Sequence, residues 1–386
     1  MITTETFIPF ALPDIGEAEV EAVAETMRSG WLTTGPRAAA FEESFSSFLG
    51  EPELHSLAVN SATAGLHLAL EALGVGPGDE VLVPTWTFTA TAEVVRYLGA
   101  QPVLVDVDES SFNIDLDGAA DAVTSRTKAI MPVHFAGLAV DRERLSAFAR
   151  RFDLAVVEDA AHALPTVSGG RLVGTGTSDV VVFSFYATKT MTTGEGGMVV
   201  TKDPQLAARM RTMRLHGISR DVFNRYRSTS PAWHYEVVAP GFKYNLPDTA
   251  AAMGLVQLSR AQGMRDRRAA IAARYRSELL DLPLHHPVDA GIGDTHAWHL
   301  YVVRLVEQVG SRDDFIAGMG RAGVGCSVHF IPLHKQPYWR DQRGLQDQMF
   351  PRASRAYERV VSLPIYSKMS DDEVGHVVSA AQQLLT

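Results

Sequence analysis

The chain has 386 residues, a formal net charge of −10, 46% hydrophobic and 21% charged residues, and a single cysteine. This composition is that of an ordinary globular protein and excludes collagen-like and disordered chains. The acidic balance, without any Lys/Arg-rich run, argues against nucleic acid as a partner.

The length and the termini set further expectations. Because a single hydrophobic core stops growing at roughly 250–300 residues, 386 residues predict one large domain and a smaller one. The N-terminus lacks the basic start and apolar core of a leader, no stretch is apolar enough to span a membrane, and Cys326 has no second cysteine to pair with. We therefore expect a cytoplasmic protein without a membrane partner.

The first two predicted elements are amphipathic helices. Apolar residues recur at helical spacing over residues 16–27, and a second helix carries Phe41, Phe45 and Phe48 after the break at Gly35.

From Leu57 onward, short runs that are apolar throughout alternate with helical stretches. The strand-like runs are residues 56–59, 80–84, 102–107, 128–135, 154–160, 180–185 and 198–201. Such alternation predicts an α/β fold, in which helices sandwich a mostly parallel central sheet. We assign this large domain to residues 1–255.

The remaining chain predicts a small α+β domain at the C-terminus. A long helical stretch within residues 247–280 predicts a helix that bridges to it. Apolar runs at 297–306 and 324–330 then flank a helix near 311–323, and a last helix follows at 370–385. We assign residues 256–386 to the bridging helix and this domain.

Lys189 and Asp159 are the first candidates for chemistry. Lys189 follows an apolar run in "VVFSFYATKTMTTGEGG". A lysine in a dry loop has a lowered pKa and a nucleophilic amine, although a lone loop lysine is more often a surface residue. Asp159 ends another apolar run, at the edge where open α/β sheets bind ligands. Its carboxylate could pair with a protonated pyridine nitrogen or simply cap the next helix.

An anion site is predicted where Ser61, Ala62 and Thr63 end one strand and open a helix. The free N–H groups of a helix start suit a phosphate, while Ser61 as a plain N-cap explains the same residues equally well. Ser184, on the strand before Lys189, offers another hydroxyl.

Two aromatic residues, Trp86 and Phe88, follow the next strand. Either ring could cover a planar cofactor, although an aromatic side chain at a strand end is more often part of the core.

The order of phosphate cup, aromatic ring, acid and lysine resembles the fold type I enzymes that use pyridoxal 5'-phosphate (PLP). Within them, the chain is similar to the DegT/StrS family of nucleotide-sugar aminotransferases over almost its whole length. The similarity is carried by "SGWLTTGPRAAAFEESFSSFLG", "NSATAGLHLAL", "GDEVLVPTWTFTATA", "VEDAAHALPT", "FSFYATKTMTTGEGGMVVT", "GFKYNLPDTAAAMGLVQL" and "VHFIPLHKQPYW".

The resemblance implies roles for the two candidates and for His162. Lys189 matches the lysine that holds PLP covalently and then acts as general base and acid. Asp159 matches the carboxylate that keeps the pyridine nitrogen protonated, and His162 the residue near the ring's phenolic oxygen. Relatives that dehydrate sugars carry histidine in place of the lysine, so Lys189 implies transamination.

The resemblance also implies the remaining cofactor contacts. Ser184, Ala62 and Thr63 match the phosphate contacts, and Phe88, rather than Trp86, matches the stacking ring. Asn245 matches an asparagine that reaches the phosphate of the neighbouring subunit's cofactor. A homodimer with shared active sites follows from that match.

His329, Thr33 and Tyr186 are expected near the substrate by the same resemblance. A histidine that is merely satisfied within the small domain remains the alternative for His329, and His134 is assigned a structural role. Many relatives carry histidine at Tyr186 and glutamine at His162, which affects cofactor tuning or substrate fit.

The implied reaction moves an amino group from L-glutamate to a nucleotide-linked keto-sugar, with pyridoxamine 5'-phosphate (PMP) as the cofactor form in the second half. Residues 233–248, "WHYEVVAPGFKYNLPD", look closest to enzymes that aminate the 4-keto position. A 3-keto acceptor is the alternative.

Other classes have less support. A regulatory protein of the same fold would have no need of Lys189 and Asp159. A nicotinamide dehydrogenase would carry G-x-G-x-x-G on the first strand-to-helix turn, which this chain lacks. We expect no metal, because the pairs His285/His286 and His329/His334 lack a third ligand at suitable spacing.

Overall fold

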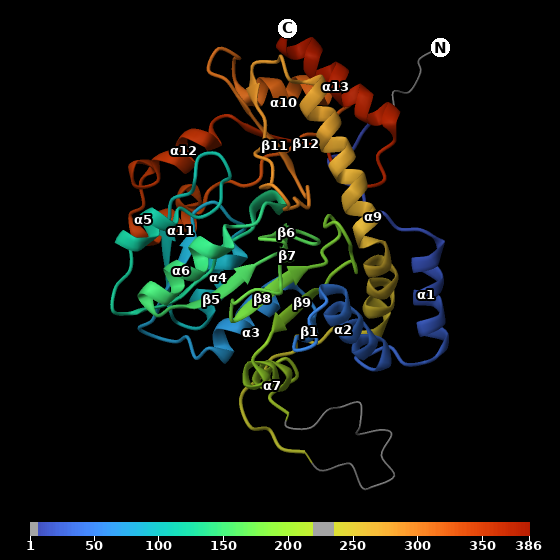
Figure 1. Cartoon of the computed structure of the whole chain (residues 1–386), viewed down its shortest axis with the longest axis vertical. Helices are drawn as coiled ribbons and strands as arrows, with labels where there is room; N and C mark the ends of the chain where they lie inside the picture. Colours follow the sequence, from blue (N-terminus) through green and yellow to red (C-terminus); the bar gives the residue numbers. More distant parts are fainter. Residues whose placement is uncertain (1–6, 219–234) are drawn as a thin grey trace.

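The computed structural model describes residues 7–218 and 235–386. A seven-stranded sheet lies at the centre of the larger part, in the order β1-β9-β8-β5-β4-β2-β3 (Figure 1). The strands are β1 (His55–Val59), β2 (Glu80–Pro84), β3 (Gln101–Val105), β4 (Thr127–Ile130), β5 (Ala155–Asp159), β8 (Val180–Ser184) and β9 (Gly197–Thr201). Within this sheet β9 runs opposite to the other six strands, which share one direction, so the prediction of a mostly parallel sheet is confirmed.

Alternate residues of each strand are buried on opposite faces, which is why the strands read as apolar throughout. In β8, Val180 and Val182 pack into one cluster, and Val181 and Phe183 into another. The first cluster is covered by α3 (Ala62–Ala72), α4 (Ala90–Tyr97) and α7 (Pro204–Met213). The opposite face is covered by α2 (Pro36–Leu49), α5 (Leu116–Asp121), α6 (Arg142–Phe152) and the first part of α9 (Asp248–Glu278).

The apolar run at 128–135 forms a shorter strand than its length predicts. β4 ends at Ile130, and Pro132 has no N–H group with which to extend the ladder. The chain instead continues into a short 3-10 helix, Phe135–Gly137. Between β5 and β8 the chain forms a short hairpin of β6 (Val167–Ser168) and β7 (Arg171–Leu172), whose strands have two residues each.

The long helix α9 runs alongside α1 (Glu17–Arg28) and α2 and then reaches the smaller sheet (Figure 1). That antiparallel sheet has the order β10-β11-β12 and packs with α10 (Arg312–Arg321) and α13 (Asp371–Leu385). Its strands are β10 (Leu284–His285), β11 (Tyr301–Leu305) and β12 (Val360–Leu363). The predicted domain boundary at residues 255 and 256 falls within α9, which begins at Asp248. The division of the chain into two domains there stays a prediction.

Part of the C-terminal region packs on the large sheet or between the large and the small sheet. It comprises α11 (Pro337–Arg343), α12 (Pro351–Tyr357) and the 3-10 helices Leu333–Lys335 and Asp347–Met349. Leu333 and Trp339 join the core around β2 and α4, and Phe350 packs in the cluster that contains Trp86. The apolar run at 324–330 contributes isolated bridges at Val324 and Ser327.

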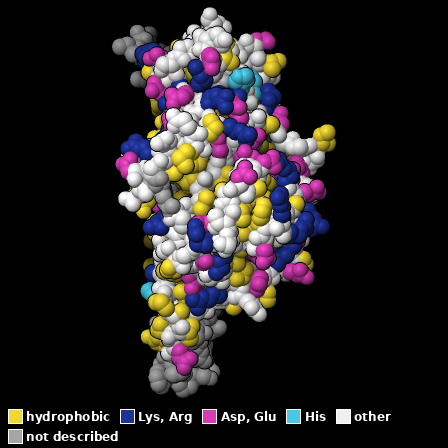
Figure 2. All heavy atoms as spheres, turned by 90° about the vertical axis from the view of Figure 1, so that its left-hand side faces the viewer, with side chains coloured by type: hydrophobic (Ala, Val, Ile, Leu, Met, Phe, Trp, Pro, Cys, Tyr) yellow, Lys and Arg dark blue, Asp and Glu magenta, His cyan; other side chains and the backbone are white. Residues whose placement is uncertain are grey.

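Charges of both signs are interspersed over the face of the molecule that Figure 2 shows. None of the helices within residues 7–218 and 235–386 combines the length and hydropathy that a membrane span requires.

Candidate active site

A cavity of about 550 Å³ lies at the carboxyl ends of β1, β2, β5 and β8. Ligands of open α/β sheets bind at this edge. Nine of the eleven predicted site residues line it, namely Ala62, Thr63, Phe88, Asp159, His162, Ser184, Tyr186, Lys189 and His329. The structure therefore brings residues that are far apart in the sequence into one site.

The amine of Lys189 and the carboxylate of Asp159 share this cavity, where Asp159 is buried and Lys189 is half-buried. Burial lowers the pKa of the Lys189 amine to about 8, while the charge of Asp159 raises it and that of Arg268 lowers it further. A larger share of the amine is thus neutral near pH 7 than for an exposed lysine. Lys189 is not the surface residue that a lone loop lysine usually is.

The Asp159 carboxylate accepts hydrogen bonds from Thr91 Oγ1 at 2.9 Å and from the backbone N–H of Ala161 at 3.1 Å. Burial nevertheless raises its pKa, and the two hydrogen bonds and the charge of Lys189 only partly oppose this effect. A cationic ring nitrogen beside the carboxylate would favour its ionised form. Turns rather than a helix follow Asp159, so the alternative of a helix cap is wrong.

The neutral form of His162 is fixed in one tautomer. Its Nδ1 accepts from the backbone N–H of Ala136 at 3.2 Å, so the ring proton resides on Nε2. Burial and the charge of Lys189 hold the pKa of His162 well below its usual value. His162 can therefore donate one hydrogen bond to a group in the cavity.

The predicted anion site lies at the start of α3. Ser61 is the N-cap of this helix, and its Oγ accepts from the N–H of Ala64 at 3.1 Å. Capping thus leaves the N–H groups of Ala62 and Thr63, like any in a first helical turn, without an intrahelical acceptor. Gly197 lies against this turn, where a Cβ would come within 2.9 Å of the Ala62 nitrogen. The two interpretations of Ser61 hold together, because the cap and the anion cup use different N–H groups.

The two candidate aromatic residues differ in environment. Trp86 is fully buried, stacks on Phe112 and donates from Nε1 to the carbonyl of His329 at 3.0 Å. Phe88 is 58% exposed and lines the cavity. Phe88 is therefore the ring available for stacking.

Thr33 and Asn245 do not line the cavity of their own chain. Asn245 donates from Nδ2 to Thr34 Oγ1 at 2.6 Å, so it lies beside the loop that carries Thr33. The role predicted for Asn245 lies in the site of a second subunit, and the role of Thr33 stays a prediction.

Among the lining residues that sequence reasoning missed are the three rings of Phe10, His299 and Phe330. Phe10 stacks on His329, with 4.9 Å between ring centroids, and the His299 ring lies 4.2 Å from that of His162. Within the described residues, Nδ1 of the buried His299 has no hydrogen-bond partner. For His299, the one available signal was a histidine within the apolar run at 297–306, "AWHLYVVRLV".

His329 combines both interpretations that the sequence left open. Its Nδ1 lies 3.2 Å from Ser362 Oγ, and its ring also lines the cavity. Burial lowers its pKa to about 4, so His329 is neutral at physiological pH.

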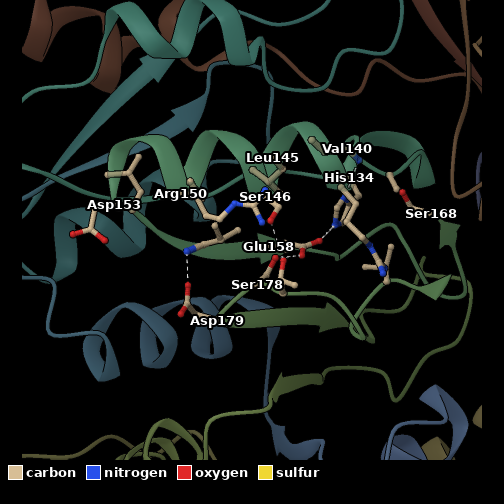
Figure 3. A pocket seen from close by; sticks show the side chains of 17 residues that line it. His134, Val140, Leu145, Ser146, Arg150, Asp153, Glu158, Ser168, Ser178 and Asp179 are labelled. Carbon is tan, nitrogen blue, oxygen red and sulfur yellow. Dashed lines mark hydrogen bonds and ion pairs between the residues drawn. The ribbon is translucent and has the colours of Figure 1, made fainter. Parts of the chain in front are cut away.

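A second pocket, of about 400 Å³, lies between α6 and β5 on the other face of the sheet (Figure 3). Glu158 accepts hydrogen bonds there from Ser178 Oγ and from His134 Nε2, the latter at 2.5 Å. His134 Nδ1 accepts from the N–H of Val140 at 3.0 Å. This closed arrangement agrees with the structural role assigned to His134.

The residues of the cavity fit PLP. The Lys189 amine suits the aldehyde, the buried Asp159 carboxylate suits a ring nitrogen, and the start of α3 suits a phosphate. Gly196 also lines the cavity, and a Cβ there would come within 2.2 Å of Thr193 Oγ1, so a larger residue would clash with that side chain. Within residues 7–218 and 235–386, no three His, Cys, Asp or Glu side chains are grouped to hold a metal ion.

Fold and site thus define a fold type I enzyme that uses PLP. The chain belongs to the DegT/DnrJ/EryC1/StrS aminotransferase family, which it matches over residues 13–382. It is therefore a sugar aminotransferase, and its cofactor is PLP, with PMP as the aminated form.

Individual relatives agree with this assignment. The spore coat polysaccharide biosynthesis protein SpsC of Bacillus subtilis is 45% identical over 98% of this chain and 97% of its own. Spr1654 of Streptococcus pneumoniae, described as a sugar aminotransferase and solved in its PMP form, superposes with a TM-score of 0.91 at 34% identity, covering 98% of each chain. PseC of Helicobacter pylori superposes with a TM-score of 0.89 at 27% identity, covering 99% of each chain.

Proposed function

We propose that the protein transfers an amino group from L-glutamate to the 4-keto group of a nucleotide-linked sugar. The observation that carries this proposal is that Lys189, with a lowered pKa, and the buried Asp159 lie in one cavity. This pair supplies the amine and the counter-charge that PLP-dependent transamination needs.

PLP supplies an electron sink that makes the α-hydrogen of a bound amine acidic. Lys189 takes that proton and returns it at the neighbouring carbon, a task that suits an amine with a pKa of about 8. Asp159 would hold the ring nitrogen and stabilise its positive charge, and His162 would donate from Nε2 to the phenolic oxygen. Ser184 and the first turn of α3 would hold the phosphate.

The mouth of the cavity is the proposed sugar site. Tyr186 and Phe88 are half-exposed or more there, and His329 and Phe10 stack at the same wall. Aromatic faces suit the apolar side of a sugar ring, and a neutral His329 can exchange hydrogen bonds with hydroxyl groups.

A homodimer with shared sites is part of this proposal. Thr33 and Asn245 lie together but outside the cavity of their own chain, so in a dimer they would complete the partner's site. Asn245 would then reach the phosphate, and Thr33 the sugar.

The names of the relatives support a sugar for a cell-surface glycan or a glycosylated product. SpsC is a spore coat polysaccharide biosynthesis protein, and PseC is an aminotransferase involved in the biosynthesis of pseudoaminic acid. The 4-keto position rests on the resemblance of residues 233–248, of which Trp233 and His234 lie outside the described residues. A 3-keto acceptor is the second candidate.

A panel of nucleotide-linked amino sugars tests the proposal in reverse. Each sugar is incubated with enzyme and 2-oxoglutarate, and glutamate is measured. We expect 4-amino sugars to react faster than 3-amino sugars. Reaction of 3-amino sugars alone would establish the second candidate, and reaction of amino acids alone would overturn the sugar assignment.

A further inference from the structure

Gln257, on α9, has a primary amide that is almost completely buried, with 1% of the residue exposed. A buried amide is costly unless its oxygen and both hydrogens are bonded. The oxygen accepts from the backbone N–H of Thr192 at 3.1 Å. The nitrogen donates to Glu19 Oε1 at 2.8 Å and to the carbonyl of Asp14 at 2.9 Å. The amide is therefore fully satisfied in one orientation.

Thr192 belongs to the loop that carries Lys189. The loop is closed by its own hydrogen bonds, from Thr192 Oγ1 and the N–H of Thr193 to the carbonyl of Phe185, both at 3.0 Å. The N–H of Gly194 donates back to Thr192 Oγ1 at 2.9 Å. Ser184 Oγ, at the end of β8, accepts from the N–H of Tyr186 at 3.4 Å at the start of this loop. Among the hydrogen bonds of the described residues, the Gln257 amide is the side chain far away in the sequence that bonds the loop's backbone beyond Lys189. This hydrogen bond therefore fixes the position of the Lys189 loop relative to α9.

The nitrogen end of the amide contacts Asp14 and Glu19, which Arg260 joins by further hydrogen bonds. Glu19 is 1% exposed, and its carboxylate also accepts from Arg260 at 2.5 Å and from the N–H of Gly16 at 2.9 Å. Arg260 bonds Asp14 Oδ1 at 2.8 Å as well. Burial works to raise the pKa of Glu19, but the hydrogen bonds from Gly16, Gln257 and Arg260 outweigh it, so Glu19 stays ionised.

The segment that precedes Asp14 in the chain leads to the cavity. Phe10 and Ala11, a few residues before Asp14, line the cavity wall, and Phe10 stacks on His329. One amide thereby joins the wall segment, the bridging helix and the lysine loop.

We infer that Gln257 is a positioning residue, which holds the loop of Lys189 in register with the N-terminal segment. This inference rests on the proposed reaction, in which Lys189 moves the proton. A displacement of about 1 Å at a reacting group costs on the order of 100-fold in rate, so loss of this hydrogen bond affects turnover more than substrate binding.

The substitution Gln257→Glu tests the inference with almost no change in shape. Near pH 8 a carboxylate at this position faces the ionised Glu19, and the two repel each other. When the pH falls, the new group becomes a carboxylic acid, which can accept from Thr192 and donate to Glu19 as the amide does. The defect of this variant should therefore be relieved by acid, unlike a simple loss of packing.

The measurements use the cofactor-loaded enzyme and its apo form. At pH 8 we expect kcat with glutamate to fall about 10- to 100-fold, with KM changed less than twofold. Without any donor, the absorbance of the bound cofactor between about 350 and 450 nm should shift, and PLP uptake by the apo-protein should slow. At pH 6 each property should approach that of the wild type measured at the same pH.

A second variant and a matched control keep the outcome decisive. Gln257→Met keeps the length but has no hydrogen bonds, so it should reproduce the pH 8 defect without relief by acid. Gln262→Met, on the exposed side of the same helix, where Gln262 bonds Asp266, should behave as the wild type. Circular dichroism confirms that each variant is folded.

Two results would overturn the inference. One is an unchanged kcat and absorbance in Gln257→Glu, and the other is a fall in melting temperature alone. If the wild type itself fails to bind PLP or to aminate any sugar, the proposed function fails instead, so the two failures are distinguishable.

Discussion

Glu158 and Asp159 are neighbours in the chain, yet their carboxylates lie on opposite faces of the large sheet. Asp159 lines the cavity with Lys189, whereas Glu158 lines the pocket under α6. Successive side chains of a strand alternate between faces, so one strand end supplies both a site residue and an anchor. The bond between His134 and Glu158, with the backbone bond from His134 N–H to the Asp159 carbonyl at 3.1 Å, holds that strand end.

This arrangement predicts that substitutions at the two adjacent positions affect different properties, turnover at Asp159 and stability at Glu158. Asp159→Asn should bind PLP but lose about 100-fold or more in kcat, because a preorganised counter-charge is removed. Glu158→Gln should keep kcat within a few-fold and lose about 1–3 kcal/mol of stability, because a charged acceptor of His134 and Ser178 is weakened. Steady-state kinetics and urea unfolding measure the two effects. Equal loss of kcat in both variants would contradict the division of roles.

The lowered pKa of Lys189 predicts how the apo-protein takes up PLP. With a pKa of about 8, roughly one amine in ten is neutral at pH 7, against roughly one in three thousand for a pKa of 10.5. The neutral form attacks the aldehyde, so the uptake rate should rise between pH 6.5 and 8 and level off above. Stopped-flow absorbance gives the profile, and a rate that still rises at pH 10 would contradict it. Asp159→Asn should level off at a lower pH, because the charge of Asp159 raises this pKa.

The two aromatic residues predict a contrast between binding and stability. Phe88→Ala should weaken PLP binding roughly three- to tenfold, the effect of one aromatic contact, with little change in unfolding. Trp86→Ala should cost about 3–5 kcal/mol of stability, because a fully buried ring is removed. PLP titration and denaturant melts distinguish the two, and the reverse pattern would assign the stacking role to Trp86.

The shared site predicts complementation between two inactive variants. Lys189→Ala and Asn245→Ala each damage both sites of a homodimer. A mixed dimer has one site with both residues intact, so co-expression and tandem purification should recover activity. The recovered activity should approach half that of the wild type per dimer. Mixed dimers as inactive as the parents would place Asn245 outside the partner's site.

The sequence predicts the sheet and the inner part of the site well, for a physical reason. Ser61, Phe88, Asp159 and Ser184 each lie at or just after the carboxyl end of a strand, and strand ends are visible as limits of apolar runs. Parallel strands then bring their carboxyl ends to one edge. The antiparallel direction of β9 leaves no such mark, because a strand buried on both faces reads the same in either direction.

The residues that were missed lie in stretches whose sequence shows no pattern that would mark them. Phe10 arrives on an irregular N-terminal segment, and His299 precedes β11 in a stretch that looks like core. Gln257 is one polar residue in a 31-residue helix, and nothing in the sequence distinguishes it from the exposed Gln262. Their positions depend on long-range packing, which local patterns do not encode. Tyr186, whose role the sequence left open, lies 48% exposed at the cavity.

The walls of the cavity begin at Phe10 and end at Ile365, so nearly the whole chain must fold before the site exists. A truncated chain that lacks either of these ends should therefore bind PLP more weakly than the complete chain. PLP binding thus distinguishes complete from incomplete folds of the chain. Its binding free energy is added only to chains that have assembled both ends, which favours complete molecules over partly folded ones in the cell.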